Sequence, residues 1–188
     1  PGATNSLGAN KALIIDTTGP TVLTVSSAKS DGAYKAGETI PISVNFDDKV
    51  KMNGLLRLTL ETGTTDAKVD HSSLSESTTL TFNYVVATGQ TSSDLDYTST
   101  TALALISGGV GDSLDNAATL TLPAPGATGS LGANKAIIID TSPPTVTLNP
   151  VDGSTDLLPT LAISIAFNEY VRLTDNLEAT STNVDALI

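Results

Sequence analysis

The stretch PGATNSLGANKALIIDTTGPTV, residues 1–22, returns as PGATGSLGANKAIIIDTSPPTV at residues 125–146. The two copies lie 124 residues apart and differ only at positions 5, 13, 18 and 19 of the first copy. A compact single domain does not need one sequence at both ends, whereas a tandem array repeats it once per unit. A period of this length matches a whole domain rather than one turn of a solenoid. The sequence therefore predicts domains in tandem.

The composition excludes several classes of function. The net charge of −11 disfavours binding to nucleic acid or to an anionic membrane, because an acidic surface repels phosphate groups. The chain has no cysteine, so thiolate metal sites, disulfides and cysteine nucleophiles are excluded. No apolar run approaches the length of a membrane span, and we expect no membrane insertion. The abundance of β-branched residues favours strands over helices.

Residues 17–140 show the pattern of one complete β domain. Apolar residues alternate along three stretches, which predicts strands with one buried face. Asn53-Gly54 predicts a hairpin turn between two of them, and residues 94–98, 118–122 and 135–139 are predicted to be further short strands. We expect no helix. The alternating inward residues are Ile40, Ile42, Val44 and Phe46, then Leu56, Leu58 and Leu60, then Leu80, Phe82, Tyr84 and Val86. Eight or nine short strands with turns between them predict an all-β fold with immunoglobulin-like β-sandwich domains in tandem.

The flanks are predicted to belong to neighbouring domains. Residues 1–16 match the end of the central domain, so we expect them to be the last strand of a preceding repeat. Residues 141–188 are predicted to be the first part of a following, diverged domain. Within it, DGSTDLLPTLAISIAFNEYV (152–171) aligns with DGAYKAGETIPISVNFDDKV (31–50).

Three stretches carry a family resemblance: LETGTTDAKVD (60–70), TTLTFNYVVATGQTSSDLDYTSTTALAL (78–105) and ATLTLPAPGATGSLGANKAIIIDTSPPTV (118–146). The chain resembles the tandem bacterial immunoglobulin-like repeats of giant secreted surface proteins and adhesins. The resemblance implies an extracellular, cell-surface location and a rod-like array, and it implies neither an enzyme nor one fixed ligand. It also implies calcium at domain junctions in many relatives. Where the family's turn has glycine, this chain has Asp115, and its strand end reads Phe46-Asp47-Asp48-Lys49-Val50.

Oxygen-bearing side chains gather at strand ends near the junctions. Loops cluster at the two ends of a sandwich, so these groups are expected to meet there, and several carboxylates together favour a hard cation such as Ca²⁺. The alternative is that they cap turns by bonding their own backbone. The candidate metal ligands are Asp16, Asp47, Asp48, Asp112, Asp115 and Asn116, with Asp140, Asn168 and Glu169 as counterparts in the next domain.

Catalysis is not expected. His71 is the only histidine, so it cannot belong to a histidine cluster, and the sequence around it carries no nucleophile motif that would indicate a triad. Asp94 and Asp96 could in principle act as an acid–base pair, because residues two apart on a strand face the same side. Most carboxylate pairs with this spacing, however, are simply exposed to solvent. The predicted role is structural, as a repeat unit of a large extracellular adhesin-like or filament-forming protein whose partners are neighbouring repeats and other copies in a filament.

Two alternatives stay open. In one, the chain is a self-assembling filament subunit in which residues 1–16 of one copy complete residues 141–188 of another by strand addition. In the other, it is a carbohydrate- or cell-surface-binding module that uses exposed tyrosines, for which Tyr34, Tyr97 and Tyr170 are the candidates.

Overall fold

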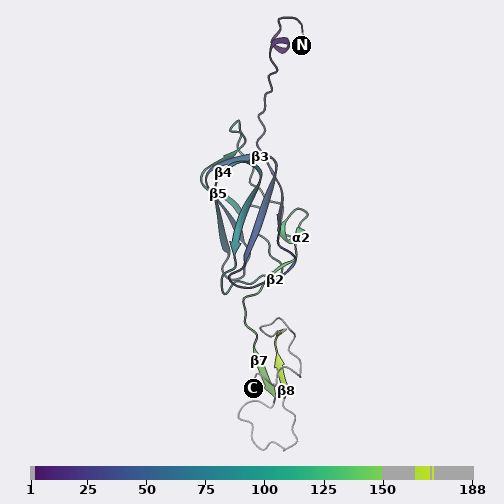
Figure 1. Ribbon diagram of the computed structural model, residues 1–188, viewed down its shortest axis with the longest axis vertical. Coiled ribbons are helices and arrows are strands. Elements are labelled where there is room, and N and C mark those ends of the chain that lie inside the picture. Colours follow the sequence, from purple (N-terminus) through teal and green to yellow (C-terminus); the bar gives the residue numbers. More distant parts are fainter. Residues whose placement is uncertain (1–2, 150–163, 170, 172–188) are drawn as a thin grey trace, which may run out of the picture. The chain divides into compact units, whose positions relative to one another are not determined.

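A computed structural model describes residues 3–149, 164–169 and 171 of the chain (Figure 1). Its elements are, in chain order, α1 (Leu7–Asn10), β1 (Val22–Ser27), β2 (Gly32–Tyr34), β3 (Thr39–Leu60), β4 (Ala67–Val85), β5 (Leu103–Gly111), α2 (Leu131–Asn134), β6 (Ile137–Ile139), β7 (Val146–Asn149) and β8 (Ser164–Phe167). Strands dominate, so the predicted all-β class is confirmed. Across the described residues, no helix is long and apolar enough to cross a membrane. The chain divides into two compact units, residues 1–141 and 142–188.

β3 and β4 form a long antiparallel ribbon that carries the first unit (Figure 1). Three register shifts interrupt their pairing within residues 45–55 of β3, and such irregularities bend a strand pair. His71 and Thr81 lie ten residues apart in β4, yet His71 Nδ1 is 3.0 Å from the Thr81 carbonyl oxygen. The His71 ring also lies 5.6 Å from the Phe82 ring. The ribbon therefore curls back on itself and encloses the core on its inner side.

Two shorter strands extend this ribbon. β1 pairs antiparallel with residues 42–46 of β3, and β5 pairs antiparallel with residues 51–58. β4 pairs with β3 along the other edge of both halves. Each half of β3 thus lies between two hydrogen-bonded neighbours.

Alternate residues of the ribbon fill the core. The residues predicted to point inward are all at most 4% exposed: Ile40, Ile42, Val44, Phe46, Leu56, Leu58, Leu60, Leu80, Phe82, Tyr84 and Val86. This confirms the predicted faces, since successive side chains of a strand point to opposite sides. Burial raises the pKa of Tyr84 to about 12, and its hydroxyl donates a hydrogen bond to Gln90 Oε1 at 2.8 Å.

The predicted hairpin at Asn53-Gly54 is wrong, because both residues lie inside β3. Gly54, with a φ of 122°, faces Gly108, with a φ of 82°, across the β3–β5 pairing. A Cβ atom on either glycine would overlap the backbone of the opposite strand. Asn53 Oδ1 accepts a hydrogen bond from the backbone N–H of Gly109 at 2.8 Å. The Asn-Gly pair therefore marks a close approach of two strands rather than a chain reversal.

Two other expectations also differ from the structure. Residues 94–98 and 118–122 were expected as strands but make only isolated bridges, such as Leu60 with Tyr97. The chain was expected to lack helices, yet the sequence LGAN forms one helical turn twice, as α1 and α2. Each turn begins at a serine whose side chain accepts a hydrogen bond from a backbone N–H three residues later. One turn is too short to show helical periodicity in a sequence.

Residues 127–141, here called the closing segment, complete the first unit. The segment contains α2 and β6, and β6 pairs in parallel with β2 and forms a bridge to Ser92. Leu131, Ile137 and Ile139 are at most 2% exposed. The closing segment therefore contributes its apolar side chains to the core built by β3 and β4.

In the second unit, β7 and β8 pair antiparallel with Val146 opposite Phe167. This matches Val22 opposite Phe46 in the pairing of β1 with β3. Most of the stretch aligned at residues 152–171, the candidate Tyr170 and most of the predicted following domain lie outside the described residues.

Candidate functional site

Asp112 caps the tight turn at residues 112–116, which carries several of the predicted metal ligands. Asp112 Oδ1 accepts hydrogen bonds from the backbone N–H groups of Leu114 and Asn116, both at 2.8 Å. Asp112 Oδ2 accepts one from Asn116 Nδ2 at 2.7 Å. Burial alone would raise the pKa of Asp112, but these hydrogen bonds outweigh it and hold the pKa below its ordinary value. In the structure, Asp112 thus has the bonding pattern of a turn cap.

The chain preceding β1 meets this turn at Asp16. Asn116 Nδ2 donates a second hydrogen bond to the Asp16 carbonyl oxygen at 3.3 Å. Asp16 Oδ1 accepts hydrogen bonds from the Thr18 N–H at 3.0 Å and the Thr18 hydroxyl at 2.7 Å, which lower the Asp16 pKa. The negative charge of Asp112 acts in the opposite direction on that pKa. Asp16, Asp112 and Asn116 are therefore brought together, as predicted for an end of the domain.

Asp47 fixes the start of β1. Its carboxylate accepts hydrogen bonds from the Thr21 N–H at 2.7 Å and the Thr21 hydroxyl at 2.6 Å, while the Asp47 N–H donates to the Thr21 carbonyl oxygen at 3.0 Å. The hydrogen bonds from Thr21 lower the Asp47 pKa. Asp48 is exposed, and its Oδ1 accepts from the Lys49 N–H at 2.7 Å. In the second unit, Asn168 Oδ1 likewise accepts from the Thr145 N–H, at 2.6 Å.

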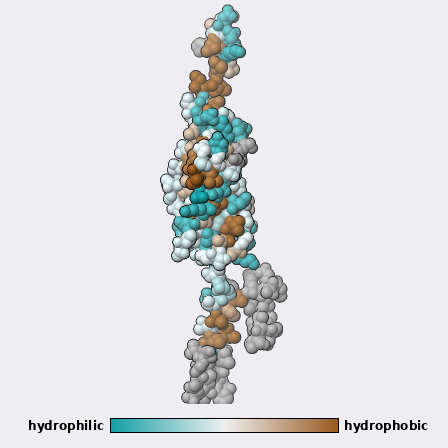
Figure 2. Space-filling model, turned by 90° about the vertical axis from the view of Figure 1, so that its left-hand side faces the viewer, coloured by the Kyte–Doolittle hydropathy of each residue, from teal (hydrophilic) through white to brown (hydrophobic). Residues whose placement is uncertain are grey.

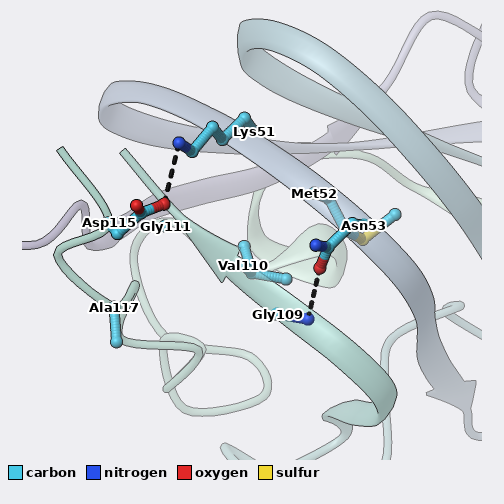
Figure 3. Close-up of a pocket in the computed structure, with 8 residues that line it drawn as sticks. All are labelled: Lys51, Met52, Asn53, Gly109, Val110, Gly111, Asp115 and Ala117. Atoms are coloured by element: carbon cyan, nitrogen blue, oxygen red, sulfur yellow. Dashed lines mark hydrogen bonds and ion pairs between the residues drawn. The ribbon is translucent and has the colours of Figure 1, made fainter. Parts of the chain in front are cut away.

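Asp115 forms an ion pair with Lys51, whose Nζ lies 2.8 Å from Asp115 Oδ1 (Figure 3). This pairing raises the Lys51 pKa. Asp115 has a φ of 66°, a left-handed conformation that aspartate tolerates better than most residues. The ion pair borders an open pocket of about 490 Å³ between β3 and β5, lined by Lys51, Met52, Asn53, Gly109, Val110, Gly111, Asp115 and Ala117. In this arrangement the negative charge of Asp115 is thus paired with the Lys51 ammonium.

The remaining candidates, Asp140 and Glu169, belong to other segments of the chain. Asp140 ends the closing segment, where its N–H donates to the Tyr34 carbonyl oxygen at 3.1 Å. It also lines a second pocket, of about 460 Å³, beside Ile139. Glu169 belongs to the second unit, where its Oε1 is buried without a hydrogen-bond partner in the described part of the chain.

Within residues 3–149, 164–169 and 171, no three His, Cys, Asp or Glu side chains group closely enough to hold a metal ion. Asp16, Asp112 and Asn116 come together, but N–H groups already occupy Asp112 Oδ1. Ca²⁺ requires six to eight oxygen ligands. The arrangement supplies part of such a set, so a calcium site here stays a prediction.

The residues considered for catalysis make structural contacts. His71 packs against Phe82, and its Nε2 is buried without a hydrogen-bond partner among the described residues. Asp96 accepts hydrogen bonds from the Tyr97 N–H and the Gly126 N–H, both at 2.9 Å. These contacts place no nucleophile beside a base.

Comparison of the chain with protein families, with curated proteins and with solved structures finds no match. The function is therefore inferred from the chain's own contacts. Sequence reasoning missed Thr21 and Lys51, because their partners Asp47 and Asp115 are distant in sequence. The polar contacts of the closing segment were also missed, although its repetition at residues 1–16 was a signal for them.

Proposed function

We propose that the chain is a structural repeat unit, built of immunoglobulin-like bodies in tandem, in a large extracellular adhesin-like or filament-forming surface protein. One observation carries this proposal: the two copies of the 22-residue repeat lead into the same local arrangement. Thr21 binds Asp47 at the start of β1, and Thr145 binds Asn168 at the start of β7. Both are followed by a valine paired with a phenylalanine. The second unit therefore begins with the same local contacts as the first, and this supports a tandem array.

A surface location is tested with antibodies raised against this chain and applied to intact source cells. The proposal expects labelling of intact cells and its loss after mild external proteolysis. Labelling that requires permeabilised cells would contradict it. An antibody against a cytoplasmic protein of the same cells provides the control for intactness.

Calcium at the junction is part of this proposal, with Asp16, Asp112 and Asn116 as the ligands that the chain would supply. Because Asp16 lies outside the strands, Asp16→Asn should remove a ligand without disturbing the core. We expect a saturable rise in melting temperature on adding CaCl₂ to the wild-type chain and reversal by a chelator. Asp16→Asn should abolish that rise, whereas Asp66→Asn, at an exposed carboxylate outside the candidate ligands, should keep it. A wild-type melting temperature that changes neither on adding CaCl₂ nor on adding chelator would refute calcium binding.

The carbohydrate-binding alternative receives less support from the contacts. It requires tyrosine rings that are exposed together, but Tyr97 is 1% exposed and its hydroxyl donates to the Pro123 carbonyl oxygen at 2.6 Å. Tyr34 is half-buried, with the Lys29 ammonium 5.0 Å from its ring centre. These two rings are engaged by the protein itself.

A further inference from the structure

The closing segment is held along its backbone by three separate parts of the first unit. Its Gly129 carbonyl oxygen accepts from the Val25 N–H at 2.8 Å, and its Ala136 carbonyl oxygen accepts from the Gly32 N–H at 3.0 Å. On the other side, the Leu95 N–H donates to Ile137 at 2.7 Å, and the Ile139 N–H donates to Ser92 at 2.8 Å. β1, β2 and residues 92–95 thus form a groove that this segment fills.

Three polar contacts fix the register of the segment in the groove. Asn134 Nδ2 donates to the Val25 carbonyl oxygen at 2.8 Å. The Ala136 N–H donates to Asp31 Oδ1 at 3.2 Å, and Lys135 Nζ lies 3.3 Å from the same oxygen. The hydrogen bonds from Ala136 and Lys135 lower the Asp31 pKa. The apolar side chains of the closing segment therefore fill the groove, and its polar contacts are satisfied in only one register.

Residues 3–16, here called the N-terminal copy, carry the same groups but do not bury them. α1 repeats the helical turn of α2, with the Ser6 hydroxyl accepting from the Ala9 N–H at 3.3 Å. Leu7 is 68% exposed, Leu13 66% and Ile15 90%. Their counterparts Leu131, Ile137 and Ile139 are 0%, 0% and 2% exposed. In Figure 2 the N-terminal copy accordingly shows apolar surface, coloured brown.

We propose that the N-terminal copy is the closing strand of a second body of the same repeat type, located ahead of it in the chain. This inference rests on the proposed tandem arrangement and specifies how its bodies are joined. The order follows from the closing segment, which comes directly after the body that it closes. Asn10 and Lys11 stand where Asn134 and Lys135 make the register contacts. The strand that seals one body would then continue into β1 of the next.

Only two residues distinguish the N-terminal copy from the closing segment over the 14 aligned positions: Asn5 replaces Gly129, and Leu13 replaces Ile137. Gly129 has a φ of 92°, and a Cβ there would lie 3.1 Å from the Leu23 carbonyl oxygen. Asn5 already has a φ of 68°, and asparagine is among the residues that tolerate this region. A groove that accepts the N-terminal copy needs a shift of a few tenths of an ångström at this point.

The fit can be tested in the full chain, because Gly129→Asn with Ile137→Leu converts the closing segment into the N-terminal copy. We expect this double variant to unfold cooperatively, with a melting temperature lowered by no more than about 5 °C, since Ile and Leu have equal volume. Ile137→Asn provides the comparison for a strand that cannot fill the groove. A double variant as unstable as Ile137→Asn would overturn the proposal.

The docking itself is tested by joining residues 17–124 to the N-terminus of the full chain, so that the N-terminal copy follows a second body. The calorimetric unfolding enthalpy should exceed that of the chain alone by about the contribution of one further first unit, because it scales with the folded residues. Leu13→Asn with Ile15→Asn should abolish the added enthalpy in the fusion but leave the unfused chain unchanged. Equal effects in both proteins would overturn the proposal.

The same variants distinguish docking within one chain from exchange between chains. An unfused chain that is monomeric by light scattering supports the proposal. Self-association that Leu13→Asn with Ile15→Asn abolishes would overturn it in favour of strand exchange between copies. None of these results depends on where the protein is located, so failure here leaves the surface-labelling test of the proposed function intact.

Discussion

At the scale of single residues, Asp112 shows how one carboxylate can fold a loop. Three N–H donors from residues 114 and 116 converge on it. Replacing it with alanine leaves these donors without their acceptor in a part-buried turn, and donors that lose their acceptor where water has limited access are costly. We expect Asp112→Ala to lower the melting temperature by roughly 5 °C or more. Asp48→Ala, at an exposed carboxylate, should change it little, and equal losses in a thermal melt would contradict this account.

Asp115 shows a different residue-scale effect, since it occupies a left-handed position with a φ of 66°. Glycine adopts this conformation without steric cost, whereas alanine does not. Asp115→Ala is therefore expected to reduce the free energy of unfolding by about 1 kcal/mol. Asp115→Gly should be close to neutral, because the relief of backbone strain offsets loss of the Lys51 ion pair. Urea titration of both variants measures the difference, and a glycine variant less stable than the alanine variant would refute it.

At the scale of elements, the β3–β5 pairing depends on two glycines. Gly54→Ala should destabilise the chain by about 3 kcal/mol or more, because the added Cβ overlaps the Ser107 backbone and the φ of 122° is strained. Gly37→Ala is the matched control, since Gly37 also has a positive φ, 89°, but faces open space. It should cost only about 1 kcal/mol. Similar losses in urea titration would show that conformation, rather than strand approach, is the cause.

The same elements show what the sequence could and could not predict. Apolar and polar residues alternate along β3 and β4, and this pattern can be read from neighbouring residues alone. The inward-facing residues of both strands were therefore predicted correctly. The continuity of β3 through Asn53-Gly54 could not be predicted, because it depends on Gly108 in a strand paired only after folding. For the same reason the turn role of Asp112 could be foreseen from neighbouring residues, whereas the pairing of Asp115 with Lys51 could not. Local patterns predict faces and turns, while bends and ion pairs depend on distant partners.

At the scale of the whole molecule, two electrostatic effects oppose each other when the pH falls. The net charge of −11 at pH 7 repels itself, and acidification relieves that repulsion. Against this, five carboxylates in the described part of the chain have pKa values held below the ordinary value by hydrogen bonds or an ion pair: Asp16, Asp31, Asp47, Asp70 and Asp112. The Asp70 carboxylate, for example, accepts hydrogen bonds from Arg57 Nε at 2.7 Å and from Arg57 Nη2 at 2.8 Å.

The lowered pKa values determine the sign of the pH dependence. A carboxyl group with a lower pKa in the folded state stabilises that state above its unfolded pKa, and the stabilisation is lost as the pH falls through the folded value. At about 0.15 M salt, repulsion between distant surface charges is screened, whereas these contacts act over bonding distances. We therefore expect the free energy of unfolding to stay level between about pH 7 and 5 and to fall below about pH 4. Asp47→Asn with Asp70→Asn should be less stable at pH 7 and lose less on acidification. Urea titrations across this range decide the matter, because a stability that rises steadily toward pH 3 would mean that relief of net charge outweighs the five local contacts.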